Sequence, residues 1–151
     1  MHQRLIIIAA LGSACMLAAA FGFQYIGELP PCKMCIWQRW PHGAAIAIGL
    51  IGALVYHRGI ALLGAAAALT TAVIGVYHAG VEQDWWEGPT TCTSGPVGDL
   101  SVQDLLTKIL EAPLVRCDEI PWEMFGVSMA GWNAIVSFGL AAIWLAAATR
   151  R

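Results

Sequence analysis

The sequence predicts an all-α membrane protein, a bundle of four transmembrane helices with a short interfacial helix in its second outer loop. Hydrophobic residues make up 58% of the 151 residues and charged residues only 12%, whereas a soluble domain is about 45–50% apolar and about 25% charged. The apolar residues gather in four long uncharged runs, which is typical of membrane-spanning helices. We expect a single integral-membrane domain, residues 1–151.

Four candidate spans follow one another along the chain. They cover about residues 5–26, 40–56, 60–78 and 125–148. The first and last are long enough to cross the hydrocarbon core, which requires about 20 residues. The second and third are shorter and are separated only by His57, Arg58 and Gly59, which predicts a tight helical hairpin. The apolar run of the first span is longer than that of a typical signal peptide, so we expect this helix to be retained.

The charged residues predict how the bundle is oriented. The two chain ends and the turn at residues 57–59 carry arginines and no carboxylate, whereas the longer loops, about 27–39 and 79–124, carry all ten carboxylates. Because basic residues flank the cytoplasmic ends of membrane spans, we expect both termini inside and both longer loops outside. The net charge of −2, without a basic patch, makes nucleic acid an improbable partner.

Four of the five cysteines fall in the outer loops. Cys32 and Cys35 form a C-x-x-C motif in the first loop, and Cys92 and Cys117 lie in the second. An even set of cysteines on the oxidising side of a membrane favours disulfides. Cys15 lies in the middle of the first span and is expected to pack as a small apolar residue. Gly, Pro, Ser and Thr surround Cys92, which predicts that this cysteine is exposed to a partner.

These two cysteine pairs allow three interpretations. Four cysteines can bind zinc, but the second pair is widely spaced and such sites belong mainly to reducing compartments, so we expect no metal. The pairs can instead be structural disulfides, although the tiny ring closed by C-x-x-C is a poor staple, and strained, exposed disulfides are usually the labile ones. The third interpretation, which we favour, is redox catalysis by two pairs that exchange electrons.

Arg39 supports the redox interpretation. It lies four residues after Cys35, so a helix that already includes Cys35 would put both residues on one face, where the guanidinium stabilises a thiolate. If the regular helix begins at Pro41 instead, the cysteines lie in an extended approach to it. The sequence is compatible with both geometries.

Two histidines are candidate ligands for a flat cofactor. His78, at the outer end of the third span, shares a helical face with Glu82 and lies close to Trp85 and Trp86. Its ring can hydrogen-bond a carbonyl oxygen of such a cofactor, although tryptophans also gather at membrane interfaces without any ligand. His42 is the second candidate at about the same depth.

The interfacial helix is predicted from the segment SVQDLLTKILE in the second loop. Ser101 and Asp104 resemble a capping box, and the apolar residues that follow form one stripe at helical spacing. Pro113 ends the pattern. Such an amphipathic helix between two spans is expected to lie in the membrane interface.

Taken together, the motifs resemble the DsbB family, the bacterial disulfide bond formation protein B. The resemblance rests on PCKMCIWQR before the second span, YHAGVEQ after the third, a cysteine pair in the second outer loop, and RCDEIPWEMFGVSMAGWNA leading into the fourth span. It covers essentially the whole chain. It implies a quinone-dependent protein dithiol oxidoreductase of the bacterial inner membrane, with cytoplasmic termini and periplasmic cysteine loops.

The resemblance also implies partners and residue roles. The enzyme would reoxidise a DsbA-like periplasmic thiol oxidase and pass the electrons to ubiquinone or menaquinone. The partner would attack Cys92, and Cys117 would then link to Cys32. Cys35 would face the quinone, with Arg39 stabilising both.

Three alternatives to this function remain. One is a related protein dedicated to a single partner, and another is a thiol oxidoreductase of the vitamin K epoxide reductase type. The last is a non-catalytic membrane scaffold with structural disulfides.

Overall fold

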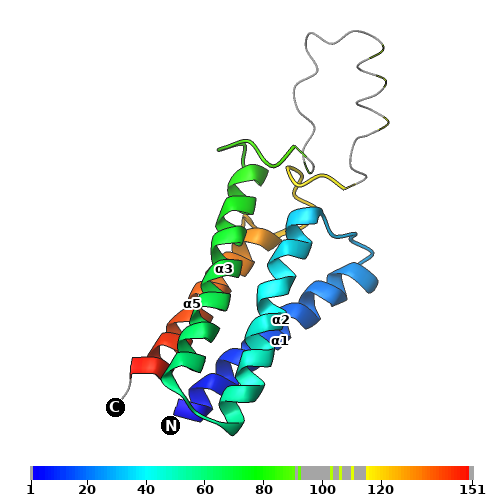
Figure 1. Cartoon of the computed structure of the whole chain (residues 1–151). Helices are drawn as coiled ribbons and strands as arrows, with labels where there is room; N and C mark the ends of the chain where they lie inside the picture. Colours follow the sequence, from blue (N-terminus) through cyan, green and yellow to red (C-terminus); the bar gives the residue numbers. More distant parts are fainter. Residues whose placement is uncertain are drawn as a thin grey trace.

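The computed structural model describes residues 2–90, 92, 103, 106, 110 and 115–149. Its helices pack side by side into one bundle (Figure 1). The elements, in chain order, are α1 (His2–Tyr25), α2 (Lys33–Leu54), α3 (Arg58–Glu82), strands β1 (Glu123–Met124) and β2 (Val127–Ser128), and α5 (Met129–Thr149). The predicted interfacial helix of the second loop lies almost entirely outside the described residues.

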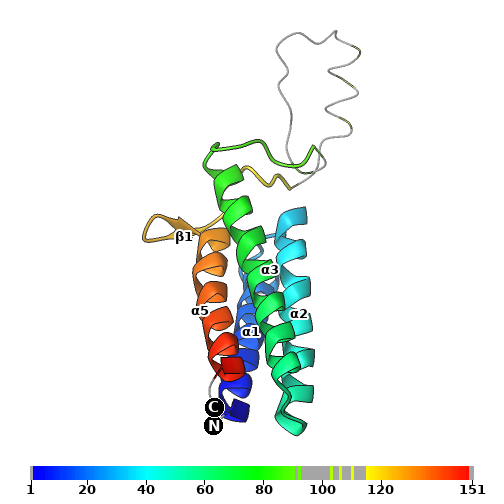
Figure 2. The same cartoon turned by 60° about the vertical axis from the view of Figure 1, so that its left-hand side comes forward.

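The fold is the predicted four-helix membrane bundle. Among the described residues, α1, α3 and α5 are long and apolar enough to cross a membrane. Helix α2 has 22 residues, and its first half carries polar side chains while its second half is apolar. Figure 2 shows that α1 begins and α5 ends at one end of the bundle, whereas α2 begins and α3 ends at the other. We call this second end, to which Cys32 and His78 belong, the redox end.

Helix α2 begins at Lys33, well before its apolar run. Cys32 is the N-cap, and its sulfur accepts a hydrogen bond from the Cys35 amide at 3.2 Å, which satisfies one of the amides that a helix start leaves free. Pro41 lies inside the helix. The structure therefore selects one of the two geometries left open by the sequence, because Cys35 and Arg39 both belong to the first turns of α2.

The helices pack closely because small residues line their contacts. Glycines and alanines of α3 face α5, and the largest fully buried side chain, Trp144 of α5, lies against Gly64. Large apolar side chains point outward on the bundle surface, among them Leu11, Leu50 and Leu63. Small residues at the contacts and large ones facing outward are typical of helices packed in lipid.

A short hairpin precedes α5. Glu123 pairs with Ser128 and Met124 with Val127, and Phe125 and Gly126 at the tip adopt positive φ angles of 56° and 74°. The indole nitrogen of Trp132 donates a hydrogen bond to the Met124 carbonyl at 3.1 Å. The first residues of the apolar run that starts at residue 125 thus form a hairpin, and the helix begins only at Met129.

Candidate active site

The C-x-x-C motif lies at the start of α2, at the redox end of the bundle. The sulfurs of Cys32 and Cys35 are 2.7 Å apart, and Cys32 is buried. The hydrogen bond with the Cys35 side chain, together with burial, raises the pKa of Cys32 above the ordinary value of a thiol. Of the two sulfurs, Cys32 is therefore the one that keeps its proton.

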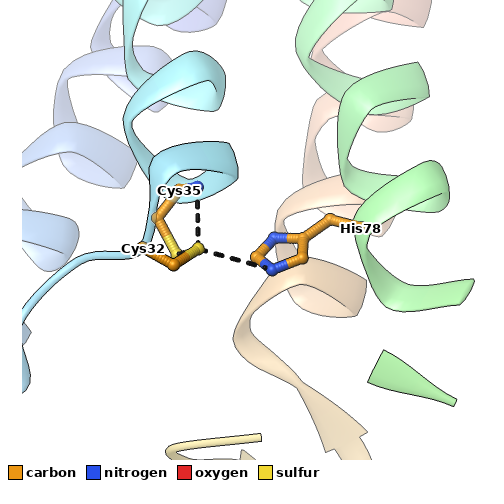
Figure 3. A group of neighbouring side chains, drawn as sticks. All are labelled: Cys32, Cys35 and His78. Atoms are coloured by element: carbon orange, nitrogen blue, oxygen red, sulfur yellow. Dashed lines mark hydrogen bonds between the residues drawn. The ribbon is translucent and has the colours of Figure 1, made fainter. Parts of the chain in front are cut away.

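His78 reaches this pair from the last turns of α3. Figure 3 shows the His78 ring directed toward Cys32. Its Nε2 lies 3.5 Å from the Cys32 sulfur and 3.8 Å from Glu82 Oε1. Glu82 accepts a hydrogen bond from the Ser128 hydroxyl, and the Ser128 oxygen in turn accepts one from the Gly131 amide at 3.2 Å. The histidine thus contacts the start of α2, and the carboxyl group is held by β2, just before α5.

The second cysteine pair packs against the first. Cys92 and Cys117 form a disulfide with their Cα atoms 5.4 Å apart, and the Cys117 amide donates to the Cys92 carbonyl at 2.9 Å. Both cysteines are fully buried in one cluster with Cys32, Met34 and Val81. The prediction that Cys92 is exposed is therefore wrong for the disulfide-bonded protein, because the bonded pair packs into this cluster.

Arg39 lies half-buried between α2 and α1. Its Nη1 donates to Gln24 Oε1 at 2.5 Å and its Nη2 to the Ala20 carbonyl at 3.4 Å. The guanidinium also lies over the Phe21 ring, 5.0 Å from its centroid, in a cation–π contact. Residues of α1 therefore fix its position.

A largely apolar cavity of about 420 Å³ adjoins the cysteines. Its walls come from α1, the segment before α2, residues 115–122 and the start of α5. The polar side chains that reach it include those of Cys35, Arg39, His42, His78 and Glu82. An apolar cavity of this size with a few converging polar groups is typical of sites for small organic ligands.

The same residues bear on the zinc interpretation. The sulfurs of Cys32 and Cys35 and one His78 ring nitrogen lie within 4.8 Å of one another, a spacing that a metal ion can bridge. Cys92 and Cys117 are bonded to each other. The four-cysteine zinc site considered from the sequence is therefore not assembled in this structure.

Comparison with known proteins identifies the family. The sequence matches the family described as disulfide bond formation protein DsbB over residues 2–147. The chain belongs to the DsbB family. It is 32% identical over 145 residues to the disulfide bond formation protein B of Shewanella sp. (strain MR-4), an alignment that covers 91% of this chain and 82% of that protein.

Other relatives carry the same name. The protein of Methylococcus capsulatus is 32% identical over 153 residues, covering 92% of this chain and 89% of its own length. That of Stutzerimonas stutzeri is 29% identical over 161 residues, covering 99% and 96%. As a member of the DsbB family, this chain is a membrane thiol oxidoreductase of disulfide bond formation, and not a scaffold.

The structure gathers at the redox end the residues to which the sequence assigned a redox or ligand-binding role. They are Cys32, Cys35, Arg39, His42, His78, Cys92 and Cys117. The pairs share a buried cluster, and the remaining three line the cavity. His42 lies deepest, with its Nε2 2.8 Å from Asn133 Oδ1.

Sequence reasoning did not find the polar groups that support these residues. Gln38, Asn133 and Ser128 are buried and hydrogen-bonded around the histidines and Glu82. One signal was present in the sequence, because a polar side chain inside a membrane span is costly and usually functional. Their partners could not be inferred, since Gln38 and Asn133 meet only after folding.

Proposed function

We propose that this DsbB-family protein oxidises a reduced DsbA-like thiol oxidase and passes the electrons to a membrane quinone. It would do so at the periplasmic face of a bacterial inner membrane, with both termini in the cytoplasm. The observation that carries the proposal is that both cysteine pairs pack together in one cluster, with Cys35 half-buried, beside an apolar cavity. This juxtaposition lets disulfides exchange on one side and a flat apolar acceptor bind on the other.

The proposed sequence of thiol–disulfide exchange starts at Cys92. A partner thiolate attacks the Cys92 sulfur, the bond to Cys117 breaks, and Cys117 leaves as a thiolate. Cys117 then attacks Cys32, so that the bond between Cys32 and Cys35 breaks and Cys35 takes the electron pair. The second thiolate of the partner attacks the partner sulfur of the mixed disulfide, so that the oxidised partner leaves and Cys92 is released as a thiolate. Each step exchanges one S–S bond for another, and the shared cluster keeps Cys117 close to Cys32.

We assign the cavity to the quinone, which is a substrate of the reaction. Two thiols and one quinone yield one disulfide and one quinol, so two electrons and two protons are transferred and the balance is complete. Cys35 supplies the sulfur that faces the ring, Arg39 supplies donors for a ring oxygen, and His42 and His78 line the cavity beside it. The mostly apolar lining suits a substrate that reaches the site from the lipid, and either ubiquinone or menaquinone satisfies this chemistry.

The test uses the purified protein in detergent with a reduced DsbA-type protein and a soluble ubiquinone analogue. Quinone absorbance should fall catalytically with the wild type and with Cys15→Ala, a control that removes a thiol outside the site. Cys35→Ala should abolish this turnover. An inactive wild type, or undiminished turnover after Cys35→Ala, would overturn the proposal.

A second variant separates the roles of the two pairs. Cys92→Ala should lose its reaction with the protein partner and keep the reaction of Cys32 and Cys35 with quinone after chemical reduction. A Cys92→Ala protein that oxidised the partner at the wild-type rate would contradict the role assigned to Cys92.

A further inference from the structure

A chain of buried side-chain hydrogen bonds crosses three helices behind the redox pair. Asn133 of α5 donates from Nδ2 to Gln38 Oε1 of α2 at 2.7 Å. Gln38 Nε2 in turn lies 2.8 Å from His78 Nδ1 of α3. The chain therefore ends on the ring whose other nitrogen, Nε2, faces the Cys32 sulfur.

Two backbone carbonyls fix which way these amides point. Gln38 Nε2 also lies 3.2 Å from the Met34 carbonyl oxygen, and Asn133 Nδ2 lies 3.3 Å from the Thr71 carbonyl oxygen. A carbonyl oxygen can only accept, so each amide must direct its NH₂ group toward it. Reversing either amide would put two acceptors face to face, and the cost of such a buried mismatch excludes it.

The rest of the cluster agrees with these orientations. The Thr71 hydroxyl donates to the Gln38 backbone carbonyl at 3.0 Å, which leaves its oxygen free to accept from Asn133 Nδ2 at 3.1 Å. Asn133 Oδ1 accepts from His42 Nε2 at 2.8 Å and from the Ser137 hydroxyl at 3.4 Å. Every amide atom of Gln38 and Asn133 thus has a partner of the correct kind.

The orientation of Gln38 determines the protonation pattern of His78. Because the Gln38 amide donates to Nδ1, this nitrogen carries a lone pair, and the proton of the neutral imidazole is on Nε2. Nε2 lies 3.5 Å from the Cys32 sulfur and 3.8 Å from Glu82 Oε1, and Cys32 shares its buried cluster with Cys117. The ring is therefore a donor toward the side on which Cys32 and Cys117 meet.

We propose that Gln38 and Asn133 are positioning residues that fix the His78 tautomer, so that its Nε2–H stabilises the Cys32 sulfur when it leaves a disulfide. This inference deepens the proposed function and rests on it for the exchange between Cys32 and Cys117. When the Cys92 thiolate attacks Cys117, the bond between Cys117 and Cys32 breaks. Cys32 leaves with the electron pair, and Nε2–H donates a hydrogen bond to this thiolate while keeping its proton.

The tautomer itself can be observed without any redox partner. In nitrogen-15 NMR spectra of the histidine-labelled protein, His78 should show an unprotonated Nδ1 and a protonated Nε2. Gln38→Met removes the donor and should move the Nδ1 resonance, whereas Ser13→Ala, which removes a buried hydroxyl from α1, should not. A protonated Nδ1 in the wild-type protein would overturn the inference.

The functional test is a double-mutant cycle on quinone-free protein. The amount of the Cys32–Cys117 disulfide is followed by trapping, which gives the rate at which this disulfide is resolved. Gln38→Met and Asn133→Val should each slow the resolution of this disulfide about tenfold or more, which is the range for a lost hydrogen bond to a charged group. In a His78→Phe background, neither substitution should slow it further. Equal slowing in both backgrounds would mean that the amides act only on folding, and would overturn the inference.

The two tests separate this inference from the proposed function. Failure of the wild-type protein to reduce a quinone analogue would reject the proposed acceptor and leave the tautomer measurement intact. A normal quinone reaction combined with additive effects in the cycle would reject only the role of Gln38 and Asn133. Thermal unfolding of each variant verifies that the bundle is folded.

Discussion

At the scale of single residues, Arg39 is held by α1 and not by the cysteines on its own helix. Gln24, Ala20 and Phe21 fix its guanidinium at the cavity wall. A cation that is already oriented in this way needs no rearrangement to donate to an oxygen of the proposed quinone, and such preorganisation favours binding.

Replacing Arg39 should therefore weaken quinone binding more than it disturbs the cysteines. We expect Arg39→Met to raise the KM for a quinone analogue by about tenfold or more, since a hydrogen bond to a charged group contributes about 1.5–3 kcal/mol. Steady-state kinetics of quinone reduction measure this KM. The control is Lys33→Met, which removes an exposed charge from the same helix start and should leave the KM unchanged; an unchanged KM after Arg39→Met would refute the assignment.

Beside Cys117, the Arg116 guanidinium donates to both carboxylate oxygens of Asp118, at 2.9 and 2.5 Å. These hydrogen bonds hold the pKa of Asp118 below its ordinary value. A lowered carboxyl pKa stabilises the folded segment at neutral pH, and this stabilisation is lost as the pH falls through the lowered pKa.

Asp118→Asn should reproduce at neutral pH what acid does to the wild-type protein. We expect faster hydrogen exchange of the Cys117 amide, by less than about tenfold, because partly exposed ion pairs contribute at most about 1 kcal/mol. Exchange in the variant should no longer respond to titration in the acid range beyond its intrinsic pH dependence. An exchange rate equal to that of the wild type at neutral pH would show that the pair is not stabilising.

At the scale of elements, the contact between α3 and α5 depends on a missing side chain. A Cβ added at Gly64 would lie 2.5 Å from atoms of the fully buried Trp144 ring. Because real side chains essentially never approach so closely, either the tryptophan or the helix would have to move. Gly64 therefore determines how closely these two helices pack.

Gly64→Ala should destabilise the bundle by about 1–3 kcal/mol, the usual cost of overpacking. Thermal unfolding in detergent measures this as a lower melting temperature. Gly139→Ala is the matched control, because nothing lies within 4 Å of a Cβ at that position of α5. That control should leave the melting temperature unchanged or raise it slightly; equal effects of the two variants would contradict the packing argument.

The helices themselves could be predicted from hydropathy, but some of their boundaries could not. Hydropathy predicted the four-helix bundle correctly, because a helix in lipid must present apolar side chains. It did not predict where α2 begins, which depends on capping by Cys32. It also missed the hairpin at residues 123–128, since Phe125 adopts a positive φ that an aromatic residue does not signal.

The candidate site also contains residues that the sequence indicated and residues that it did not. Four cysteines, Arg39 and both histidines are candidates from the sequence because their residue types and spacing carry chemistry, and the structure places them close together. The roles of Gln38 and Asn133 could not be predicted, because their hydrogen bond joins positions 95 residues apart. The sequence predicted that Cys92 is exposed, and this is wrong. The composition of the neighbouring segment does not reveal that Cys92 packs against the other cysteine pair.

At the scale of the whole molecule, both ends of the bundle can be tested for their side of the membrane. In a chain whose native cysteines are replaced by alanine, Glu28→Cys should react with an impermeant maleimide in spheroplasts. Arg58→Cys should react only after the membrane is permeabilised, because the short arginine-bearing turn is expected inside. Both residues are exposed, so a reversed labelling pattern would reverse the proposed topology.

The crowding of all redox groups at one end of the bundle has an energetic consequence. Cys32 and Cys35 begin α2, His78 and Glu82 end α3, and the cavity adjoins them. In the proposed reaction, the dithiol brings both the electrons and the protons that form a quinol, so no net charge crosses the hydrocarbon core. A charge moved across the membrane would gain or lose about 2.3 kcal/mol per 100 mV. The reaction should therefore be electroneutral, with equal rates in energised and uncoupled proteoliposomes.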